Sequence, residues 1–300
     1  MTALAAQANQ DRQRIDARQN SSRIGIVAGA GALPVALAEA ALARGLQPFI
    51  IGLAGNASSD IERFPHAYAG LGQIGRTLRT LRREGCQRIA FVGSLKRPNL
   101  FHLRPDAGFF RHLPELLRFF RGGDDAVLRR VARFFEAQGF EVVGVHEVAP
   151  RLLAPSGVFS RARPDAVAKE DIALAFRVAR TLGALDIGQG VVVARHYVLA
   201  VEAAEGTDAM LTRCRDLNSW GFKSRQGVLV KMPKPGQDLR LDMPVVGPRT
   251  VELAAAAGLA GIAVAAGTVL LADQQELVEK ADECGLFLYG ASSAEVMGSE

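Results

Sequence analysis

Short apolar runs alternate with amphipathic stretches in the first half of the chain. The runs RIGIVA (23–28), PFIIGL (48–53) and RIAFVG (88–93) have the length and the β-branched content of buried strands. Between them, residues 32–44 and 73–84 repeat apolar positions at helical spacing. Strict alternation of strand and helix is typical of right-handed βαβ units around a parallel sheet.

This alternation continues to residue 148. Two further amphipathic helices are expected at about residues 109–121 and 124–138, followed by the strand EVVGV (141–145). We therefore predict an N-terminal Rossmann-like parallel-sheet domain over residues 23–148.

The pattern changes beyond that domain. Residues 149–168 contain three prolines and little periodicity, which is the composition of a linker. The elements expected after it are, in chain order, a helix at 169–182, two strands joined by a tight turn in GVVVARHYVLAVEA (190–203), a helix from Thr207, the strand GVLVK (227–231) and a helix from Val246. Residues 169–300 are therefore predicted to form an α+β catalytic domain with a mixed sheet, which makes the chain α/β overall.

Residues 253–272 (LAAAAGLAGIAVAAGTVLLA) are uncharged and about as long as a bilayer span. Their glycines and high alanine content favour a different interpretation, in which GIAV (261–264) and TVLLA (268–272) are paired strands joined by a tight turn. Asp273 begins the sequence DQQE, which resembles a helix capping box. We therefore expect no membrane span here.

The chain carries a formal net charge of +5, which would suit a polyanion or a phosphorylated ligand. Arginine and alanine are frequent throughout, so the charge marks no particular segment, and we expect no nucleic-acid partner. Cys86, Cys214 and Cys284 are far apart and form no CxxC motif, which argues against a disulfide framework or a cysteine zinc site and favours a cytoplasmic protein. Residues 1–22 lack the apolar run of a secretory signal and are predicted to be a disordered extension.

The sequence AGAGALP (28–34) follows the first predicted strand and opens the first helix. Gly29, Ala30 and Gly31 are placed where backbone N–H groups and a helix N-terminus could contact a phosphate or a sugar. The motif is not GxGxxG and no acidic residue closes the next strand, so a bound NAD is disfavoured and a tight structural turn remains an alternative. Gly93 and Ser94 leave the third strand at the corresponding position, in the loop GSLKRP, whose basic residues Lys96 and Arg97 would suit a diphosphate or could simply face solvent.

Residues 101–123 interleave phenylalanines with arginines. Such a stretch could rest on an anionic membrane surface or hold acyl chains, or it could be a core helix whose arginine stems cover apolar surface. Asp124 and Asp125 follow at the next helix start, where capping explains one of them and leaves the other, which we assign as Asp125, to face a ligand.

Carboxylates and hydroxyls also gather beside predicted strands in the second half. Glu205, Thr207 and Asp208 follow a strand and begin a helix, where Thr207 could act as an N-cap or the group could hold Mg²⁺ or a sugar hydroxyl. Asp186 and Gln189, in LDIGQG, precede the strand VVVA, and the neighbouring glycines would allow a ligand to approach closely.

The segment KMPKPGQDLRLDMPVVG (231–247) combines rigidity with charge. Its three prolines fix backbone dihedrals and hold the charged side chains with little entropy left to lose on binding. Lys231, Lys234 and Arg240 could neutralise phosphate, while Asp238 and Asp242 could bind a hard cation. A rigid loop with both charges is what phosphoryl-transfer chemistry requires, although a purely structural proline loop is an alternative.

In this order, AGAGALP, the GDDAVLRRV helix, DIGQGVVV, AVEAAEGTDAM and KMPKPGQDLRLDMPVVG resemble the LpxI-type UDP-2,3-diacylglucosamine pyrophosphatases of lipid A biosynthesis. The resemblance extends from Arg23 to Gly290. It implies a dimeric, two-domain enzyme that binds a UDP-linked diacylated glucosamine lipid between its domains and uses Mg²⁺ or Mn²⁺. It also implies hydrolysis to UMP and 2,3-diacylglucosamine 1-phosphate (lipid X), with water attacking the UMP-side phosphorus. We expect the protein to be cytoplasmic and to make peripheral contact with the inner membrane.

The resemblance places the essential aspartate of that family at Asp242, which would hold metal or orient the attacking water. Local chemistry makes Asp208 the second expected metal ligand. The residues expected to contact the substrate are Gly29, Ala30, Gly31, Gly93, Ser94, Asp125, Asp186, Gln189, Glu205, Thr207, Lys231 and Lys234. Where the family pattern is usually AGGG, this chain has Ala30, whose methyl group could crowd the backbone approach.

Two other functions compete with hydrolysis. A nucleotide-binding oxidoreductase would use the first domain and would change nicotinamide fluorescence on titration. A non-catalytic sensor of a sugar nucleotide or an anionic lipid would bind tightly without turnover.

Overall fold

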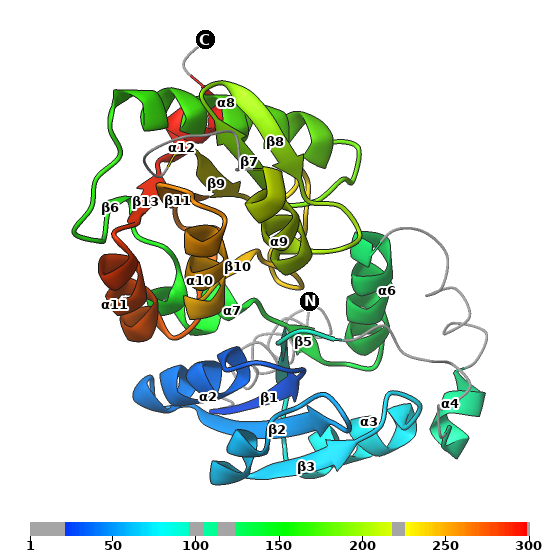
Figure 1. Cartoon of the computed structure of the whole chain (residues 1–300). Helices are drawn as coiled ribbons and strands as arrows, with labels where there is room; N and C mark the ends of the chain where they lie inside the picture. The colour runs from blue at the N-terminus through cyan, green and yellow to red at the C-terminus, as the bar shows by residue number, and fades with distance from the viewer. Residues whose placement is uncertain (1–21, 96–104, 113–123, 218–225, 299–300) are drawn as a thin grey trace, which may run out of the picture. The chain divides into compact units, whose positions relative to one another are not determined.

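The computed structural model describes residues 22–95, 105–112, 124–217 and 226–298, coloured in Figure 1 from blue to red along the chain. The chain divides into two compact units, Met1–Ala149 and Pro150–Glu300. All but the last residue of the predicted extension at residues 1–22, and most of the basic aromatic stretch at 101–123, lie outside the described residues.

The first unit is built on an entirely parallel sheet. Its strand order is β3-β2-β1-β4-β5, so the order reverses between β1 and β4 as in Rossmann-like folds. The strands are β1 (Arg23–Ala28), β2 (Gln47–Leu53), β3 (His66–Ala69), β4 (Arg88–Val92) and β5 (Glu141–Val142). The helices are α2 (Leu33–Ala43), a 3-10 turn (Ser59–Arg63), α3 (Ile74–Arg83), α4 (Ala107–Arg111), α6 (Asp124–Ala137) and α7 (Val145–Val148).

The Rossmann-like prediction for this unit is confirmed, but two of its strands differ from expectation. β3 was missed, because HAYA is shorter and less apolar than β1, β2 and β4. The strand expected at residues 141–145 ends after Val142 and turns into α7, in which Glu147 accepts the N–H of Gly144 at 2.7 Å. Val145 and Val148 are buried one helical turn apart, so the apolar run serves a short helix instead of a longer strand.

The second unit has a six-stranded mixed sheet of order β6-β13-β11-β9-β7-β8. β13, β11 and β9 are parallel, while β6 and β7 pair antiparallel to β13 and β9, and β8 pairs antiparallel to β7. The strands are β6 (Gly157–Val158), β7 (Gly190–Ala194), β8 (Tyr197–Val201), β9 (Val228–Lys231), β11 (Gly261–Ala265) and β13 (Phe287–Ala291), with the separate pair β10 (Val245–Val246) and β12 (Leu270–Leu271). The helices are a 3-10 turn (Pro150–Leu152), α8 (Ala166–Gly183), α9 (Thr207–Leu217), α10 (Pro248–Ala256), α11 (Gln274–Cys284) and α12 (Ser293–Met297).

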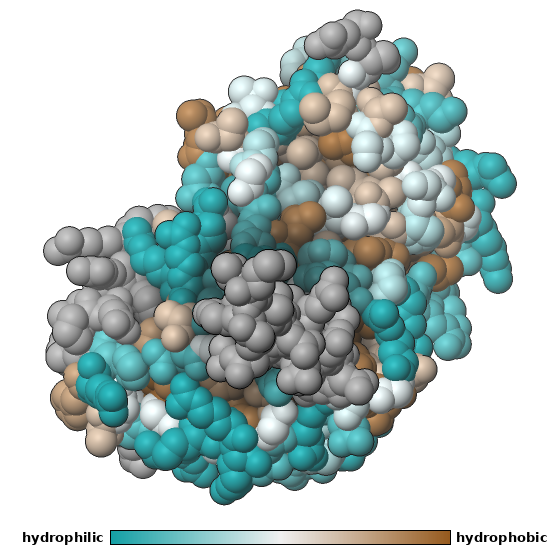
Figure 2. All heavy atoms as spheres, turned by 180° about the vertical axis from the view of Figure 1, so that it is seen from behind, coloured by the Kyte–Doolittle hydropathy of each residue, from teal (hydrophilic) through white to brown (hydrophobic). Residues whose placement is uncertain are grey.

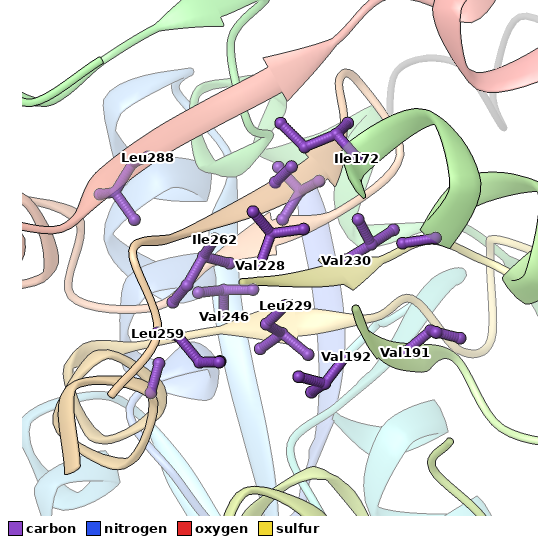
Figure 3. Close-up of a cluster of buried hydrophobic side chains, with 14 of the residues drawn as sticks. Ile172, Val191, Val192, Val228, Leu229, Val230, Val246, Leu259, Ile262 and Leu288 are labelled. Atoms are coloured by element: carbon purple, nitrogen blue, oxygen red, sulfur yellow. The ribbon is translucent and has the colours of Figure 1, made fainter. Parts of the chain in front are cut away.

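The core of the second unit lies on both faces of this sheet. Val228 and Val230 point toward Ile172 of α8, whereas Leu229 points to the opposite face with Leu259 (Figure 3). All four residues of β9 are buried, as expected for a central strand that is covered on both faces. The mixed-sheet prediction is thereby confirmed, and β9 is fixed as a rigid support for the residues that follow it.

The segment expected to be a linker belongs to the second unit. β6 pairs with β13 between Val158 and Tyr289, and the N–H of Ala154 donates to the carbonyl of Val269 at 2.9 Å. The linker prediction at residues 149–168 is therefore wrong beyond Ala149. Its three prolines allow a chain that lies along the sheet without forming regular structure.

The paired strands predicted within residues 253–272 are also corrected. β11 and β12 both form, but β11 pairs with β9 and β13, whereas β12 pairs with β10. Asp273 adopts a left-handed conformation with φ 46° and makes no side-chain cap, so the predicted capping box is absent. No described helix is long and apolar enough to cross a membrane. On the face shown in Figure 2, strongly hydrophobic residues lie in small areas between hydrophilic ones.

A buried aspartate that sequence reasoning overlooked fixes the β7–β8 hairpin. Asp171 of α8 is 1% exposed and accepts the N–H groups of Arg195 and His196 at 2.9 and 2.7 Å. Both turn residues have positive φ, as a two-residue hairpin turn requires. Asparagine and glycine usually occupy such positions, but this turn has neither. The carboxylate therefore stabilises a strained turn and sets the register of β7 against β8.

We expect Asp171→Ala to destabilise the second unit by about 3 kcal/mol, because two N–H groups of a strained turn lose a buried, charged acceptor. Urea denaturation followed by circular dichroism measures the loss, and hydrogen exchange over residues 190–201 locates it. The neighbouring Glu170→Ala is the matched control, since Glu170 is exposed and contacts only the exposed ring of His196. Equal midpoints for the two variants would show that Asp171 does not hold the turn.

Candidate active site

Three segments that are distant in sequence meet at one edge of the second sheet. β8 and β9 run in the same direction with β7 antiparallel between them, so the ends of β8 and β9 lie beside the start of β7. Gly190 is paired with Lys231, and the N–H of Glu202 donates to the carbonyl of Gly190 at 2.9 Å. The sheet therefore brings together DIGQG, AVEAAEGTDAM and KMPKPGQDLRLDMPVVG.

Two glutamine amides hold the carboxylate of Asp242. Gln237 Nε2 donates to Asp242 Oδ2 at 2.6 Å, and Gln189 Nε2 donates to the same oxygen at 3.1 Å. Hydrogen bonds to the ionised form stabilise it, so the two amides favour a carboxylate at this position. They also fix its orientation before any ligand binds.

The orientation of Gln237 is itself determined by the loop. Its Oε1 accepts the backbone N–H of Lys234 at 2.8 Å and Gln189 Nε2 at 3.1 Å. Because both partners are donors, the amide oxygen must face them, which leaves the amide nitrogen to face Asp242. The proline-rich loop thus forms a closed hydrogen-bond network that ends on this carboxylate.

Lys231, the last residue of β9, is a buried cation. Its side chain is only 6% exposed, and Nζ donates to Thr207 Oγ1 at 2.7 Å and to the carbonyl of Val245 at 3.3 Å. Thr207 Oγ1 in turn donates to Glu202 Oε1 at 3.0 Å. A chain of hydrogen bonds therefore joins the end of β9 to the start of α9 and the end of β8.

Burial lowers the pKa of Lys231 because the ammonium loses its water, and three carboxylates act against that loss. In order of effect these are Glu202, Asp242 and Asp208. The negative charge of Asp242 therefore favours the charged form of Lys231. The site holds opposite charges on a rigid frame.

The other predicted residues of this unit are partly committed to ion pairs. Asp186 accepts a short hydrogen bond from Lys234 Nζ, which ties the DIGQG segment to the loop after β9. Asp208 pairs with Arg249 at 2.6 Å, and Glu205 pairs with Arg213 at 2.9 Å. Roles for Glu205 and Asp208 toward a ligand stay predictions, since each would share its carboxylate with an arginine.

The glycine-rich loops of the first unit meet each other at the point where the strand order reverses. Ala30 and Ser94 exchange backbone hydrogen bonds at 2.8 and 3.0 Å, and Gly29 donates its N–H to the carbonyl of Val92 at 2.8 Å. These donors, predicted as phosphate contacts, are therefore already used between the two loops.

This contact between loops explains the glycines. A Cβ on Gly29 would lie 2.5 Å from the carbonyl oxygen of Ser94, and one on Gly93 would lie 2.7 Å from that of Ala30. Gly31 has φ +98° with open space around it, so it remains the predicted residue best placed to meet a ligand. The methyl group of Ala30 was expected to crowd the approach, but the backbone of Ala30 is turned to Ser94 instead of to a ligand.

Two predictions on this unit are not tested by the geometry. Asp125 lies at the start of α6, but its side chain is outside the described part of the chain. The basic residues Lys96 and Arg97 of the loop after β4 are likewise outside it.

Comparison with known proteins identifies the sequence family. The model of the LpxI N-terminal domain matches residues 23–152, and that of the LpxI C-terminal domain matches residues 155–289. The chain is also 44% identical to the UDP-2,3-diacylglucosamine pyrophosphatase LpxI of Caulobacter vibrioides over 276 residues, which cover 91% of this chain and 99% of that protein. The chain belongs to the LpxI family.

The LpxI C-terminal domain contains the entire hydrogen-bond network around Asp242 and Lys231. Two of its members were missed by sequence reasoning, namely Glu202 and Gln237. Glu202 is the first charged residue after the apolar strand β8, and this position was the signal that could have indicated it. Gln237 could not be recognised from its type, because its role depends on the fold of the loop around it.

Proposed function

We propose that this LpxI family member hydrolyses the diphosphate of UDP-2,3-diacylglucosamine to UMP and 2,3-diacylglucosamine 1-phosphate in lipid A biosynthesis. The observation that carries the proposal is a carboxylate held by two amides, together with a buried ammonium whose charged form it favours, in a chain related to a protein named for this activity. Diphosphate hydrolysis needs a group to orient water and a cation to stabilise the charge that develops on phosphate oxygens.

Asp242 is the residue proposed to act on the attacking water. When ionised, both of its oxygens accept hydrogen bonds and neither donates, and the amide N–H groups of Gln189 and Gln237 suit that state. A water hydrogen-bonded to this carboxylate would be oriented toward the UMP-side phosphorus. The two amides restrict the carboxylate to one position, which reduces the entropy lost when the water is aligned.

Lys231 is the residue proposed to stabilise developing charge. It has three N–H donors, of which Thr207 and Val245 accept two among the described residues. The third is free to donate to a diphosphate oxygen, in a place where burial strengthens electrostatic interactions. Lys234, Asp186 and Gln189 are proposed to contact the head group of the substrate.

We propose that a divalent metal binds here with the help of the substrate. Among the described residues no three His, Cys, Asp or Glu side chains are grouped to hold a metal ion. Mg²⁺ in phosphoryl-transfer sites is usually held by one or two carboxylates together with the phosphates of the substrate, so a full cage is not required. Asp242, assisted by Asp208, is proposed to hold Mg²⁺ or Mn²⁺, which would polarise the diphosphate and neutralise its charge.

The remaining parts of the proposal concern the setting of the reaction. We propose a homodimer in the cytoplasm that makes peripheral contact with the inner membrane, because the substrate carries two acyl chains. Gly31 and Asp125 are proposed as substrate contacts from the first unit.

The reaction is tested by incubating the purified full chain with UDP-2,3-diacylglucosamine and Mg²⁺ or Mn²⁺ in ¹⁸O-water. We expect release of UMP that carries the label, because water attacks the UMP-side phosphorus. Label in the lipid phosphate alone would contradict the site of attack. Tight binding of the substrate without release of UMP would favour a sensor over an enzyme.

A further inference from the structure

Glu202 has a buried oxygen that its own contacts do not explain. Its Oε1 accepts the hydroxyl of Thr207, but Oε2 is inaccessible to water and has no hydrogen-bond partner in the described part of the chain. A carboxylate oxygen without a donor is unfavourable unless a positive charge lies nearby. That charge is Lys231, whose Nζ lies 2.7 Å from the same Thr207 hydroxyl that donates to Glu202 Oε1 at 3.0 Å.

The glycines of the DIGQG segment make room for this glutamate. A Cβ on Gly190 would lie 2.6 Å from Glu202 Oε2, and a Cβ on Gly188 would lie 2.0 Å from the carbonyl oxygen of Glu202. Gly188 also has φ +57°. Two glycines, which the sequence suggested would admit a ligand, therefore admit the side chain and the backbone of Glu202.

Two hydrogen bonds connect Glu202 to Lys231 through the hydroxyl of Thr207. Because the Thr207 hydroxyl donates its proton to Glu202, its lone pairs are directed to Lys231 Nζ, which donates to it at 2.7 Å. The charged groups that face Lys231 come from three elements. These are Glu202 after β8, Asp208 in α9 and Asp242 in the loop after β9.

We propose that Glu202 is a positioning residue that holds Thr207 and, through it, keeps the Lys231 ammonium charged and directed at the diphosphate. This inference rests on the proposed function for the reaction that Lys231 assists. Glu202 itself need not touch the substrate, because its effect passes through Thr207. Gly188 and Gly190, which have no side chains, leave the space that Glu202 occupies.

Glu202→Gln tests the role with little change in shape. Glutamine keeps an oxygen that can accept from Thr207 but removes the negative charge, so the pKa of Lys231 falls further. We expect the alkaline limb of the kcat/KM profile to move to lower pH, because activity is lost as Lys231 loses its proton. At the alkaline pH values of that limb, kcat/KM of Glu202→Gln should be about ten- to hundredfold below that of wild type, as is found for residues that orient a functional group. Glu170→Gln is the matched control and should leave the profile unchanged.

A second variant tests the same role without changing Glu202, so the test does not depend on whether Glu202→Gln folds. Gly190→Ala changes no charge, but its methyl group would displace Oε2, so we expect a shift of the alkaline limb in the same direction. Thr207→Val removes the hydroxyl that joins Glu202 to Lys231 and should reproduce the shift.

The charge state of Lys231 is also measurable without substrate. In the full chain with isotopically labelled lysine, NMR titration should give a lower pKa for Lys231 in Glu202→Gln than in wild type, with Lys231→Met identifying the signal. An unchanged Lys231 pKa, or an alkaline limb at the wild-type position in Glu202→Gln, would overturn the inference. If wild type released no UMP while the Lys231 pKa still fell in Glu202→Gln, the proposed function would fail and the positioning role would stand.

Discussion

Asp242→Asn is expected to reduce UMP release by about a thousandfold without unfolding the protein, because the variant loses the charge of the carboxylate that both glutamines bind. An asparagine oxygen could still accept from Gln189 and Gln237, so the loop after β9 should keep its conformation. The loss would therefore appear in kcat, with the circular dichroism spectrum and the urea midpoint close to wild type. Steady-state assay of UMP over a range of substrate concentrations measures it.

The control for this variant is Glu252→Gln, which removes a carboxylate of the same unit whose partner is Lys280 on the surface. Surface pairs of this kind contribute little to stability, so wild-type activity and stability are expected. If Asp242→Asn cleaved the substrate at the wild-type rate, Asp242 would have no part in the chemistry.

The sequence was sufficient to predict the strands that carry this site. GVVVA and GVLVK are continuous apolar runs because both faces of the sheet are covered, and such runs are readable without a structure. Because the apolar runs also show where the strands end, Thr207, Lys231 and Asp242 were expected near strand ends. Their convergence at a single edge was not readable, since it depends on β7 lying antiparallel between β8 and β9.

Pairing between strands accounts for most of the errors in the fold. β11 and β12 are close in sequence and were expected to pair, but each pairs with strands that are distant along the chain. The segment at 149–168 has the composition of a linker, yet the edge of β13 offers it backbone partners through β6. Local composition contains no information about such partners, which explains why these elements were misplaced.

The glycines near the site also show that a sequence does not reveal which distant segment will be a neighbour. The sequence suggested that Gly29, Gly93, Gly188 and Gly190 would let a ligand approach, because close approach is what glycine permits. In the structure, another part of the protein makes that approach in each case: Ser94 or Ala30 in the first unit and Glu202 in the second. A glycine motif therefore predicts that something comes close to the backbone, but only the structure shows what it is.

Lys231→Met is expected to lower both activity and stability, for reasons that can be separated. The variant removes the ammonium proposed to stabilise the diphosphate, so UMP release should fall by about a hundredfold or more. It also leaves Glu202 Oε2 buried without its neighbouring positive charge, which should destabilise the second unit by about 3 kcal/mol.

The double variant Lys231→Met/Glu202→Gln distinguishes the two effects. Removing the unpaired carboxylate should restore most of the lost stability in urea denaturation, because the charge that had to be compensated is gone. Activity should remain as low as in Lys231→Met, since no cation is returned to the site. A double variant no more stable than Lys231→Met would contradict the pairing of the two charges, whereas recovery of activity would show that the ammonium is not required for the reaction.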